Sequence, residues 1–292
     1  MSNAKFIVFL CGVNTVLIES GSSKSSWILL FDKKIIKEFT LAGINPSTQS
    51  KSSILSLLEI AKQNLGDLPT QAIYFYGAGC KGMAQIMMQE LLNHCFITEK
   101  IEVHSDLLAA ARSSCNGKEG IVCILGTGSH SCLSDGHVIT HERPSLGYLL
   151  GDEGSGNFYG KLLLQAYFYK MMNSSLDEKF IESFPFVREE YLSQLYSSPR
   201  ISFELAQFFP FLINNKNEAL IQEIINTGIR AFYEARLKEY EPKNSIPVYI
   251  VGNVGNQLKL EYLQFLEMKG FKQIYFNPLP IADLINYHNK YV

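Results

Sequence analysis

Residues 124–136 read ILGTGSHSCLSDG, and this stretch decides how the rest of the chain is interpreted. An apolar run leads into a bare Gly/Ser loop, and an alternating run follows it. Nearly the same pattern occurs earlier, where residues 18–30 read IESGSSKSSWILL. A shift of 106 positions aligns Ser20-Gly21-Ser22-Ser23 with Gly126-Thr127-Gly128-Ser129, and a strand-like apolar run precedes each loop. The sequence therefore predicts an internal repeat of one supersecondary unit.

The hydrophobic periodicity predicts strands and helices that alternate along two similar halves. We expect strands over 16–19, 26–31, 35–42, 72–77, 100–104, 121–125, 132–134, 137–142, 247–251 and 273–276. We expect helices over 52–65, 77–93, 105–112, 155–172 and 281–288, and helical structure throughout 176–240. Strands that alternate with helices in two similar halves favour a two-lobed α/β molecule with a cleft.

Composition limits the classes of partner and compartment. The 292 residues are 47% hydrophobic and 18% charged, which is enough to build a full core. A net charge of −2, with Lys and Arg spread thinly, argues against a nucleic-acid binder. No apolar run reaches the roughly 18 residues of a membrane helix, and residues 5–18 lack a signal-peptide cleavage site. We therefore expect a cytoplasmic protein, and the role of residues 1–14 stays open.

The cysteines favour a reducing compartment as well. The six thiols form no CxxC pair, which fits buried, reduced cysteines better than disulfides or a zinc site. They are Cys11, Cys80, Cys95, Cys115, Cys123 and Cys132.

Both Gly/Ser loops have the composition of an anion-binding turn. Glycine and serine let backbone N–H groups approach an anion closely, and a nest of such donors suits phosphate oxygens. Neither loop matches the Walker pattern GxxxxGK[ST] or the dinucleotide pattern GxGxxG after a strand. A single loop of this kind is more often a plain hairpin, but two related loops from two lobes could hold one polyphosphate between them.

The two loops differ at one informative position. Glu19 precedes the first loop, whereas Leu125 holds the matching place in the second. A carboxylate beside only one phosphate loop is what a Mg²⁺ site requires, because Mg²⁺ takes a few oxygen ligands together with water and substrate phosphates. The alternative is a strand-end glutamate that faces solvent. Lys24 could likewise neutralise phosphate or simply lie on the hairpin surface.

Seven stretches, taken in order, resemble one known family. They read IESGSSKSSW (18–27), GINP (43–46), YFYGAGC (74–80), HSDLLAAAR (104–112), CILGTGSHSC (123–132), PSLGYLLGDEGSG (144–156) and VYIVGNVGNQ (248–257). From about residue 16 onward the chain resembles the N-acetylglucosamine kinases and the BadF/BadG/BcrA/BcrD ATPase family, of the sugar kinase/actin/Hsp70 superfamily.

The resemblance implies an α/β, two-lobed actin-like ATPase (ribonuclease H-like) fold with duplicated mixed β-sheet domains and a cleft between them. The N-terminal lobe would span residues 1–116, and the C-terminal lobe, with a helical insert, would span 117–276. A C-terminal helix within 277–292 would pack back on the N-terminal lobe.

The resemblance also implies roles for individual residues. The family's two phosphate motifs and its adenosine motif assign ATP binding to Gly21, Ser22, Ser23, Lys24, Gly126, Thr127, Gly128, Ser129, Gly252, Asn253 and Gly255. Asp106 aligns with the catalytic base, which takes the proton from the sugar 6-hydroxyl as it attacks the γ-phosphoryl group. Sugar contacts fall on Asn45, Gly77, Asp106, Thr127, His130, Gly147 and Asp152. Glu19 would hold Mg²⁺ through water.

Each of three polar residues also has a purely structural interpretation. Without the resemblance, Asp106 is typical of a helix cap, Asn45 of an Asn-Pro turn and Asp152 of a charge at a helix N-terminus.

Several positions depart from the family pattern. The first phosphate motif often begins with Asp and carries Thr residues, whereas this chain has Glu19, Ser23 and Ser25, which retain oxygen chemistry with a different reach. Ser26 replaces a frequent acidic residue. His130 stands where Asn is commoner, at a position that contacts sugar in relatives, so the identity of the sugar stays open.

The resemblance therefore predicts an ATP- and Mg²⁺-dependent kinase for the 6-hydroxyl of N-acetylglucosamine or a related amino sugar. One alternative is a sugar-binding sensor or regulator with weak catalysis. Another is an ATPase that activates a partner enzyme, although those relatives carry an iron–sulfur cluster for which no cysteine pattern is present. We expect a small sugar as partner, no nucleic acid and no membrane, and the stretch 176–240 could form a homodimer surface or pack within its lobe.

Overall fold

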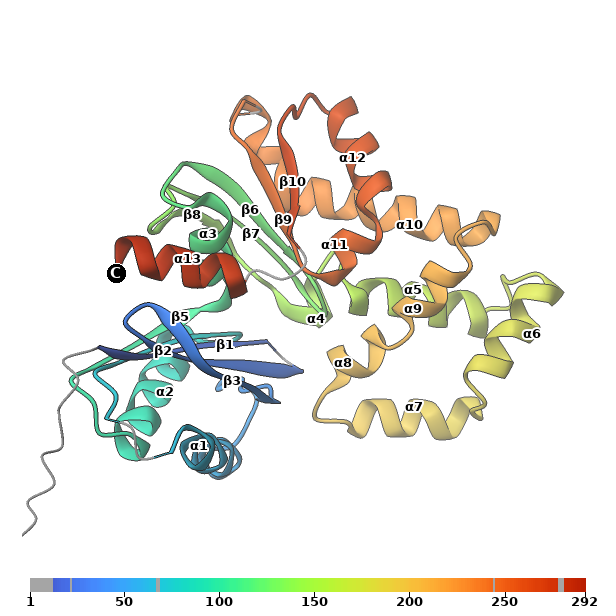
Figure 1. Ribbon diagram of the computed structural model, residues 1–292. Helices are drawn as coiled ribbons and strands as arrows, with labels where there is room; N and C mark the ends of the chain where they lie inside the picture. The colour runs from blue at the N-terminus through green and yellow to red at the C-terminus, as the bar shows by residue number, and fades with distance from the viewer. Residues whose placement is uncertain (1–12, 22, 67–68, 244, 278–280) are drawn as a thin grey trace, which may run out of the picture. The chain divides into compact units, whose positions relative to one another are not determined.

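The computed structural model describes residues 13–21, 23–66, 69–243, 245–277 and 281–292 (Figure 1). The chain divides into two compact units, Met1–Asp106 and Leu107–Val292. From the sequence we expect the boundary after residue 116, and the division lies ten residues earlier, after Asp106. The reason is that the helix that begins at Asp106 packs on the second sheet. Its buried residues Leu107 and Ala111 lie in one apolar cluster with Val122 and Val251.

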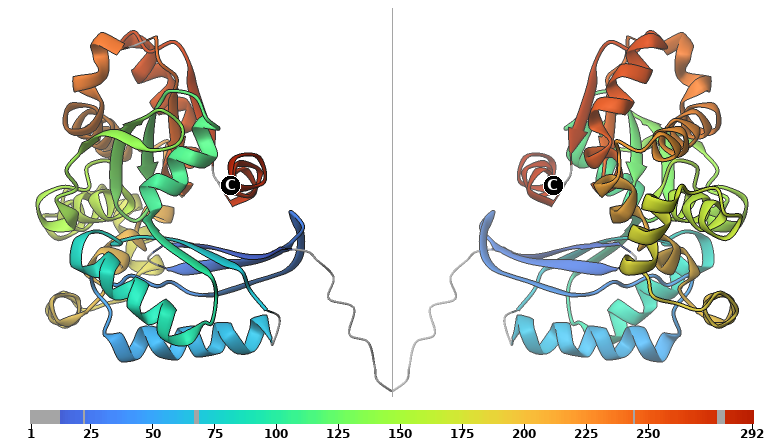
Figure 2. Two further views of the ribbon diagram at one scale, coloured as in Figure 1. Left: turned by 90° about the vertical axis from the view of Figure 1, so that its left-hand side faces the viewer. Right: turned by 90° about the vertical axis from the view of Figure 1, so that its right-hand side faces the viewer.

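In its described residues, the first unit is a five-stranded sheet with two helices. Its elements are β1 (Asn14–Ser20), β2 (Lys24–Phe31), β3 (Lys34–Ala42), α1 (Lys51–Leu65), β4 (Ala72–Gly77), α2 (Gly82–Cys95) and β5 (Lys100–Ser105). The strand order is β3-β2-β1-β4-β5, with β1, β2 and β3 antiparallel and β4 and β5 parallel to β1. Both helices cover the same face of the sheet, where Trp27 and Phe75 are fully buried (Figures 1 and 2).

The second unit repeats this sheet. Its elements are α3 (Asp106–Cys115), β6 (Gly120–Leu125), β7 (Ser129–Ser134), β8 (Ile139–Arg143), α4 (Gly147–Leu150), α5 (Gly156–Phe168), α6 (Ser174–Ser183), α7 (Arg188–Ser197), α8 (Ile201–Ala206), α9 (Phe209–Asn214), α10 (Ala219–Phe232), η1 (Tyr233–Leu237), η2 (Lys238–Lys243), β9 (Val248–Val251), α11 (Asn253–Gln257), α12 (Lys259–Met268), β10 (Ile274–Asn277) and α13 (Ile281–Tyr291). The strand order is β10-β9-β6-β7-β8, and α3 begins at the last residue of the first unit.

The two sheets have the same topology. In each, one strand (β1 or β6) pairs with an antiparallel hairpin partner on one side and with a parallel strand on the other. The Gly/Ser loops join β1 to β2 and β6 to β7. The predicted duplication is therefore confirmed at the level of the sheets.

The stretch predicted as helical over 176–240 consists of several short helices (Figure 1). Prolines account for some of the breaks, because proline removes a backbone donor and restricts the residue before it. Pro185 follows α6 and Pro199 follows α7. The aromatic side chains here pack together, with the rings of Phe180 and Phe208 stacked 5.9 Å apart, so this aromatic content forms core.

The C-terminal helix α13 contacts its own unit. The Tyr287 hydroxyl lies 3.0 Å from His137 Nδ1, the Tyr291 hydroxyl donates to the Asn116 carbonyl at 3.0 Å, and the Arg112 guanidinium lies over the Tyr287 ring. These contacts join α13 to α3 and to the turn after β7. Packing of this helix on the first lobe stays a prediction.

The cysteines follow the sequence expectation where they are described. Five of them are buried and free, namely Cys80, Cys95, Cys115, Cys123 and Cys132, and Cys11 lies outside the described residues. In the part of the chain that the structure describes, no helix is long and apolar enough to cross a membrane.

Candidate functional site

In the first unit, the carboxyl ends of three parallel strands lie side by side. β1, β4 and β5 are neighbours in this order, with Ser20 in register with Gly77 and Gly77 in register with Ser105. Asp106 follows Ser105 directly, and Glu19 is the penultimate residue of β1. Ligands of α/β sheets bind outside this edge, so two carboxylates lie where such a ligand would bind.

The two carboxylates influence each other. Burial, and then the negative charge of Asp106, raise the pKa of Glu19 from its ordinary value of 4.5 to about 7, while Lys24 opposes the rise. Burial, and then Asp106, also raise the pKa of the Cys80 thiol to about 12. The charge of Asp106 therefore reaches both the end of β1 and the turn after β4.

A divalent cation would suit this edge. Among the described residues, no group of three or more His, Cys, Asp and Glu side chains could hold a metal by itself. Glu19 and Asp106 would nevertheless fit Mg²⁺, because that ion takes one or two carboxylates together with water and phosphate oxygens, and its charge would offset their repulsion.

The first Gly/Ser loop is a tight turn, of which Ser22 lies outside the described residues. The Gly21 N–H donates to the Lys24 carbonyl at 3.0 Å, and the Ser23 carbonyl accepts from Gly43 N–H at 3.2 Å. Ser23 and Lys24 are exposed. The Ser25 hydroxyl instead bonds within the core, donating to the Ala42 carbonyl at 2.9 Å and accepting from the Trp27 indole at 3.0 Å.

Asn45 lies against the turn that follows β4. Its Oδ1 accepts from the backbone N–H of Ser47 at 3.0 Å and from the Ser47 hydroxyl at 2.6 Å, which is the turn expected for an Asn-Pro sequence. A Cβ added at Gly79 would collide with the Asn45 amide, and one added at Gly77 would collide with Phe75 and Cys80. Asn45 thus lies against Gly79, two residues after Gly77 at the end of β4.

In the second unit, the loop between β6 and β7 is held by the start of α5. The backbone N–H of Gly156 donates to the Gly126 carbonyl at 2.8 Å, and that of Asn157 donates to the Thr127 carbonyl at 3.1 Å. The loop carbonyls therefore accept from the first turn of a helix, whose N–H groups lack partners within the helix. Loop 126–129 is fixed in shape by these bonds.

Asp152 is bonded to the same loop. This residue is 7% exposed and has the left-handed backbone angle φ 57°. Its Oδ1 accepts from Ser129 N–H at 3.2 Å, and its Oδ2 accepts from Asn157 Nδ2 at 2.8 Å. A Cβ at Gly128 would lie 3.0 Å from both carboxylate oxygens, so glycine there permits the close approach of Asp152.

The predicted adenosine motif lies beside this loop. β9 runs parallel to β6 with Val251 in register with Ile124, so Gly252 emerges next to Leu125, at the start of the loop. Gly252 has φ 111°, and a Cβ there would lie 2.6 Å from the Leu125 carbonyl oxygen. A Cβ at Gly255 would collide with Ile250, while Asn253 is exposed at the start of α11. Both glycines are required by this close packing.

His130 and Gly147 lie apart from these hydrogen bonds. His130 is on β7, where its Nε2 is 2.8 Å from Glu142 Oε1 on β8. Gly147 begins α4 with φ 67° and accepts from Gly151 N–H at 2.8 Å. The structure shows the surroundings of both residues, and their sugar contacts stay predictions.

Comparison with solved structures decides the family. No family model matches the chain, and no curated protein is detectably similar to it. A structure from Porphyromonas gingivalis is 30% identical, covers 95% of this chain and 99% of its own, and has a TM-score of 0.89. One from Chromobacterium violaceum is 14% identical, covers 94% and 98%, has a TM-score of 0.75 and supports the fold alone. Both are named "putative N-acetylglucosamine kinase".

The chain belongs to the N-acetylglucosamine kinase family. The two-unit α/β architecture is accordingly that of an actin-like ATPase, as the sequence predicts.

Two buried polar residues of this kinase-family chain escaped the sequence prediction. Asn157 bonds to Thr127 and Asp152 from the first turn of α5. Arg236, 2% exposed on the π-helical turn η1, donates to the Pro144 carbonyl at 2.7 Å and lies 3.3 Å from Glu153 Oε2. Each is a polar residue in a helical segment, and a buried polar residue cannot be told from a solvent-facing one in a single sequence.

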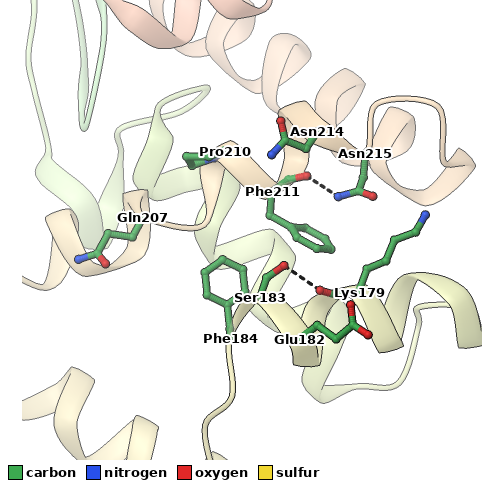
Figure 3. Close-up of a pocket in the computed structure, with 9 residues that line it drawn as sticks. All are labelled: Lys179, Glu182, Ser183, Phe184, Gln207, Pro210, Phe211, Asn214 and Asn215. Atoms are coloured by element: carbon green, nitrogen blue, oxygen red, sulfur yellow. Dashed lines mark hydrogen bonds between the residues drawn. The ribbon is translucent and has the colours of Figure 1, made fainter.

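A pocket lies among helices α6, α8 and α9 of the second unit. Its volume is about 410 Å³, and it is lined by Lys179, Glu182, Ser183, Phe184, Gln207, Pro210, Phe211, Asn214 and Asn215 (Figure 3). Its polar groups partly bond among themselves, as in the bond from Asn215 Nδ2 to the Phe211 carbonyl at 2.8 Å. None of the residues predicted for kinase chemistry lines it.

Proposed function

We propose that this protein is an ATP-dependent kinase that phosphorylates the 6-hydroxyl of N-acetylglucosamine or a related amino sugar. The observation that carries the proposal is the placement of Glu19 and Asp106 at the same edge of the first sheet, at the carboxyl ends of β1 and β5, with the charge of Asp106 acting on Glu19. Family membership gives the reaction class, and these carboxylates supply groups that the reaction needs.

Asp106 is the general base of the proposed reaction. The sugar oxygen forms a bond to the γ-phosphorus while the bond from that phosphorus to the bridging oxygen of ADP breaks, and the hydroxyl proton passes to the Asp106 carboxylate. A positioned carboxylate is suited to this step, because phosphoryl transfer depends mainly on orientation and charge stabilisation.

The second unit supplies the remaining nucleotide-binding groups, beside those of the first Gly/Ser loop. Loop 126–129 offers backbone N–H donors to phosphate, and Gly252 and Gly255 let the chain pass close to the adenosine. Mg²⁺, held through water by Glu19, would neutralise phosphate charge. Asp152 and Asn45 would accept from or donate to sugar hydroxyls, and Asp152 retains acceptor capacity beyond its two hydrogen bonds.

Coupled measurement of ADP release with Mg²⁺ tests this function. The panel contains N-acetylglucosamine, glucosamine, N-acetylmannosamine, N-acetylmuramic acid and glucose. We expect sugar-dependent turnover that is largest for one N-acetylated amino sugar. ADP release at the same rate with and without every sugar would contradict the proposal.

A sugar-binding regulator with weak catalysis is the second candidate. Two features of the first phosphate loop favour it, since the Ser25 hydroxyl bonds to Trp27 and Ala42 and burial keeps the pKa of Glu19 near 7. A sugar that raises the melting temperature without stimulating turnover would select this candidate.

A further inference from the structure

The side chain of Asn157 links two parts of the predicted site in the second unit, loop 126–129 and Asp152. It is fully buried in the first turn of α5. Its Nδ2 donates to the Thr127 carbonyl at 2.7 Å and to Asp152 Oδ2 at 2.8 Å. One side-chain amide thus joins the Gly/Ser loop to the carboxylate that is proposed to contact sugar.

The orientation of this amide is fixed by its partners. Both neighbours of Nδ2 are acceptors, so exchanging the amide oxygen and nitrogen would place Oδ1 against two oxygens. Oδ1 is therefore on the other side, where it is buried and finds no donor among the described residues. Asn157 thus acts on Thr127 and Asp152 only as a donor.

The same bonds determine which loop groups face a ligand. The carbonyls of Gly126 and Thr127 accept from α5, and Ser129 N–H donates to Asp152. Within the described part of the chain, the N–H groups of Thr127 and Gly128 meet no acceptor. The loop therefore turns its carbonyls inward and leaves two donors for an anion, as an anion-binding nest does.

We propose that Asn157 is a positioning residue that makes loop 126–129 and Asp152 one hydrogen-bonded unit, so that nucleotide phosphate on the loop and sugar on Asp152 strengthen each other's binding. This inference rests on the proposed kinase function. The physical reason is that the Asp152 carboxylate accepts a hydrogen bond from Ser129 N–H, so a ligand that orders Asp152 also orders the loop. Coupling between two binding sites is reciprocal, so a ligand on the loop favours sugar binding by the same factor.

Calorimetric titration of a non-hydrolysable ATP analogue with Mg²⁺, with and without saturating N-acetylglucosamine, tests the inference. Asn157→Ala removes the amide, and Asn157→Leu keeps roughly its shape but removes the donor, which guards against failure of either variant to fold. Tyr159→Phe is the matched control, because it lies on the same helix, is fully buried and loses the hydroxyl bonds to the Ile225 carbonyl and to Tyr262.

We expect the sugar to tighten analogue binding to the wild type. In both Asn157 variants the analogue should bind about tenfold more weakly, as expected when buried acceptors lose their donor, and the sugar should no longer affect its affinity. Tyr159→Phe should retain wild-type affinity and the sugar effect. Folded Asn157 variants that bind the analogue with wild-type affinity and keep the sugar effect would overturn the inference. An equal loss of analogue affinity in Tyr159→Phe would overturn it as well.

A second readout separates this inference from the proposed function. If the wild type binds neither ligand, the kinase proposal fails, and hydrogen exchange of the Ser129 amide in the unliganded protein decides about Asn157. Faster exchange in Asn157→Ala than in Tyr159→Phe would support the positioning role. Equal exchange in the two variants would refute it.

Discussion

Glu19 and Asp106 interact through charge: burial, and then the negative charge of Asp106, raise the pKa of the Glu19 carboxyl group to about 7. Glu19 lies near the end of β1 and Asp106 directly follows β5, and β4 lies between these two parallel strands. In the free protein the two negative charges oppose each other, and a bound cation would offset this repulsion.

The stability of the free protein should therefore depend on the charge of Glu19. Because folding raises this pKa from 4.5 to about 7, the native state holds a proton that the unfolded chain releases. The stability that protonated Glu19 contributes to the folded state is fully present below about pH 4.5, and it is lost as the pH rises through 7. We expect Glu19→Gln to be more stable than the wild type at pH 8, by up to about 3 kcal/mol.

Urea unfolding of both proteins from pH 4.5 to 8 measures this difference. Glu38→Gln, at an exposed position on β3, is the control. Parallel stability profiles for Glu19→Gln and the wild type would show that Glu19 does not titrate in this range.

Substitution of Gly252 should damage both stability and nucleotide binding. Its φ of 111° disfavours any side chain, and a Cβ would lie 2.6 Å from the Leu125 carbonyl oxygen. Gly252→Ala should lower the free energy of unfolding by about 1–3 kcal/mol. Gly126→Ala is a stability control, because its Cβ would meet no atom within 4 Å. Equal denaturation midpoints for the two variants would contradict this account of Gly252.

Loss of the buried Arg236 guanidinium should destabilise the second unit. Its partners are the Pro144 carbonyl and Glu153 on the segment that carries Asp152. Breaking a buried ion pair from one side costs about 3–5 kcal/mol, because the partner charge is left unpaired. We expect Arg236→Met to unfold at lower denaturant concentration than wild type, and Glu153→Gln in the same protein to recover part of the loss. No recovery in the double variant would show that the two residues do not act as a pair.

Much of the fold could be predicted because its signals are local. Alternating and apolar runs mark the strands, and the two Gly/Ser loops mark equivalent turns of a duplicated sheet. Glu19 and Asp106 could also be placed, since each follows or ends a recognisable strand.

The hydrogen bonds around Asp152 could not be predicted, because they join residues far apart in the sequence. Ser129 and Asp152 are neighbours only after folding, and the left-handed backbone of Asp152 has no signal in an aspartate. At Ser25 the sequence pattern misleads instead. The pattern is typical of a serine whose hydroxyl faces phosphate, but the hydroxyl accepts from the Trp27 indole.

The most direct test of the central claim compares sugar-dependent ADP release by the wild type and by Asp106→Asn at saturating ATP and Mg²⁺. We expect the variant to retain sugar binding, measured by its effect on the melting temperature, while kcat falls by about 10²–10⁴-fold, as expected for loss of a general base. An Asp106→Asn protein that phosphorylates the sugar at the wild-type rate would contradict the assignment of Asp106 as the base.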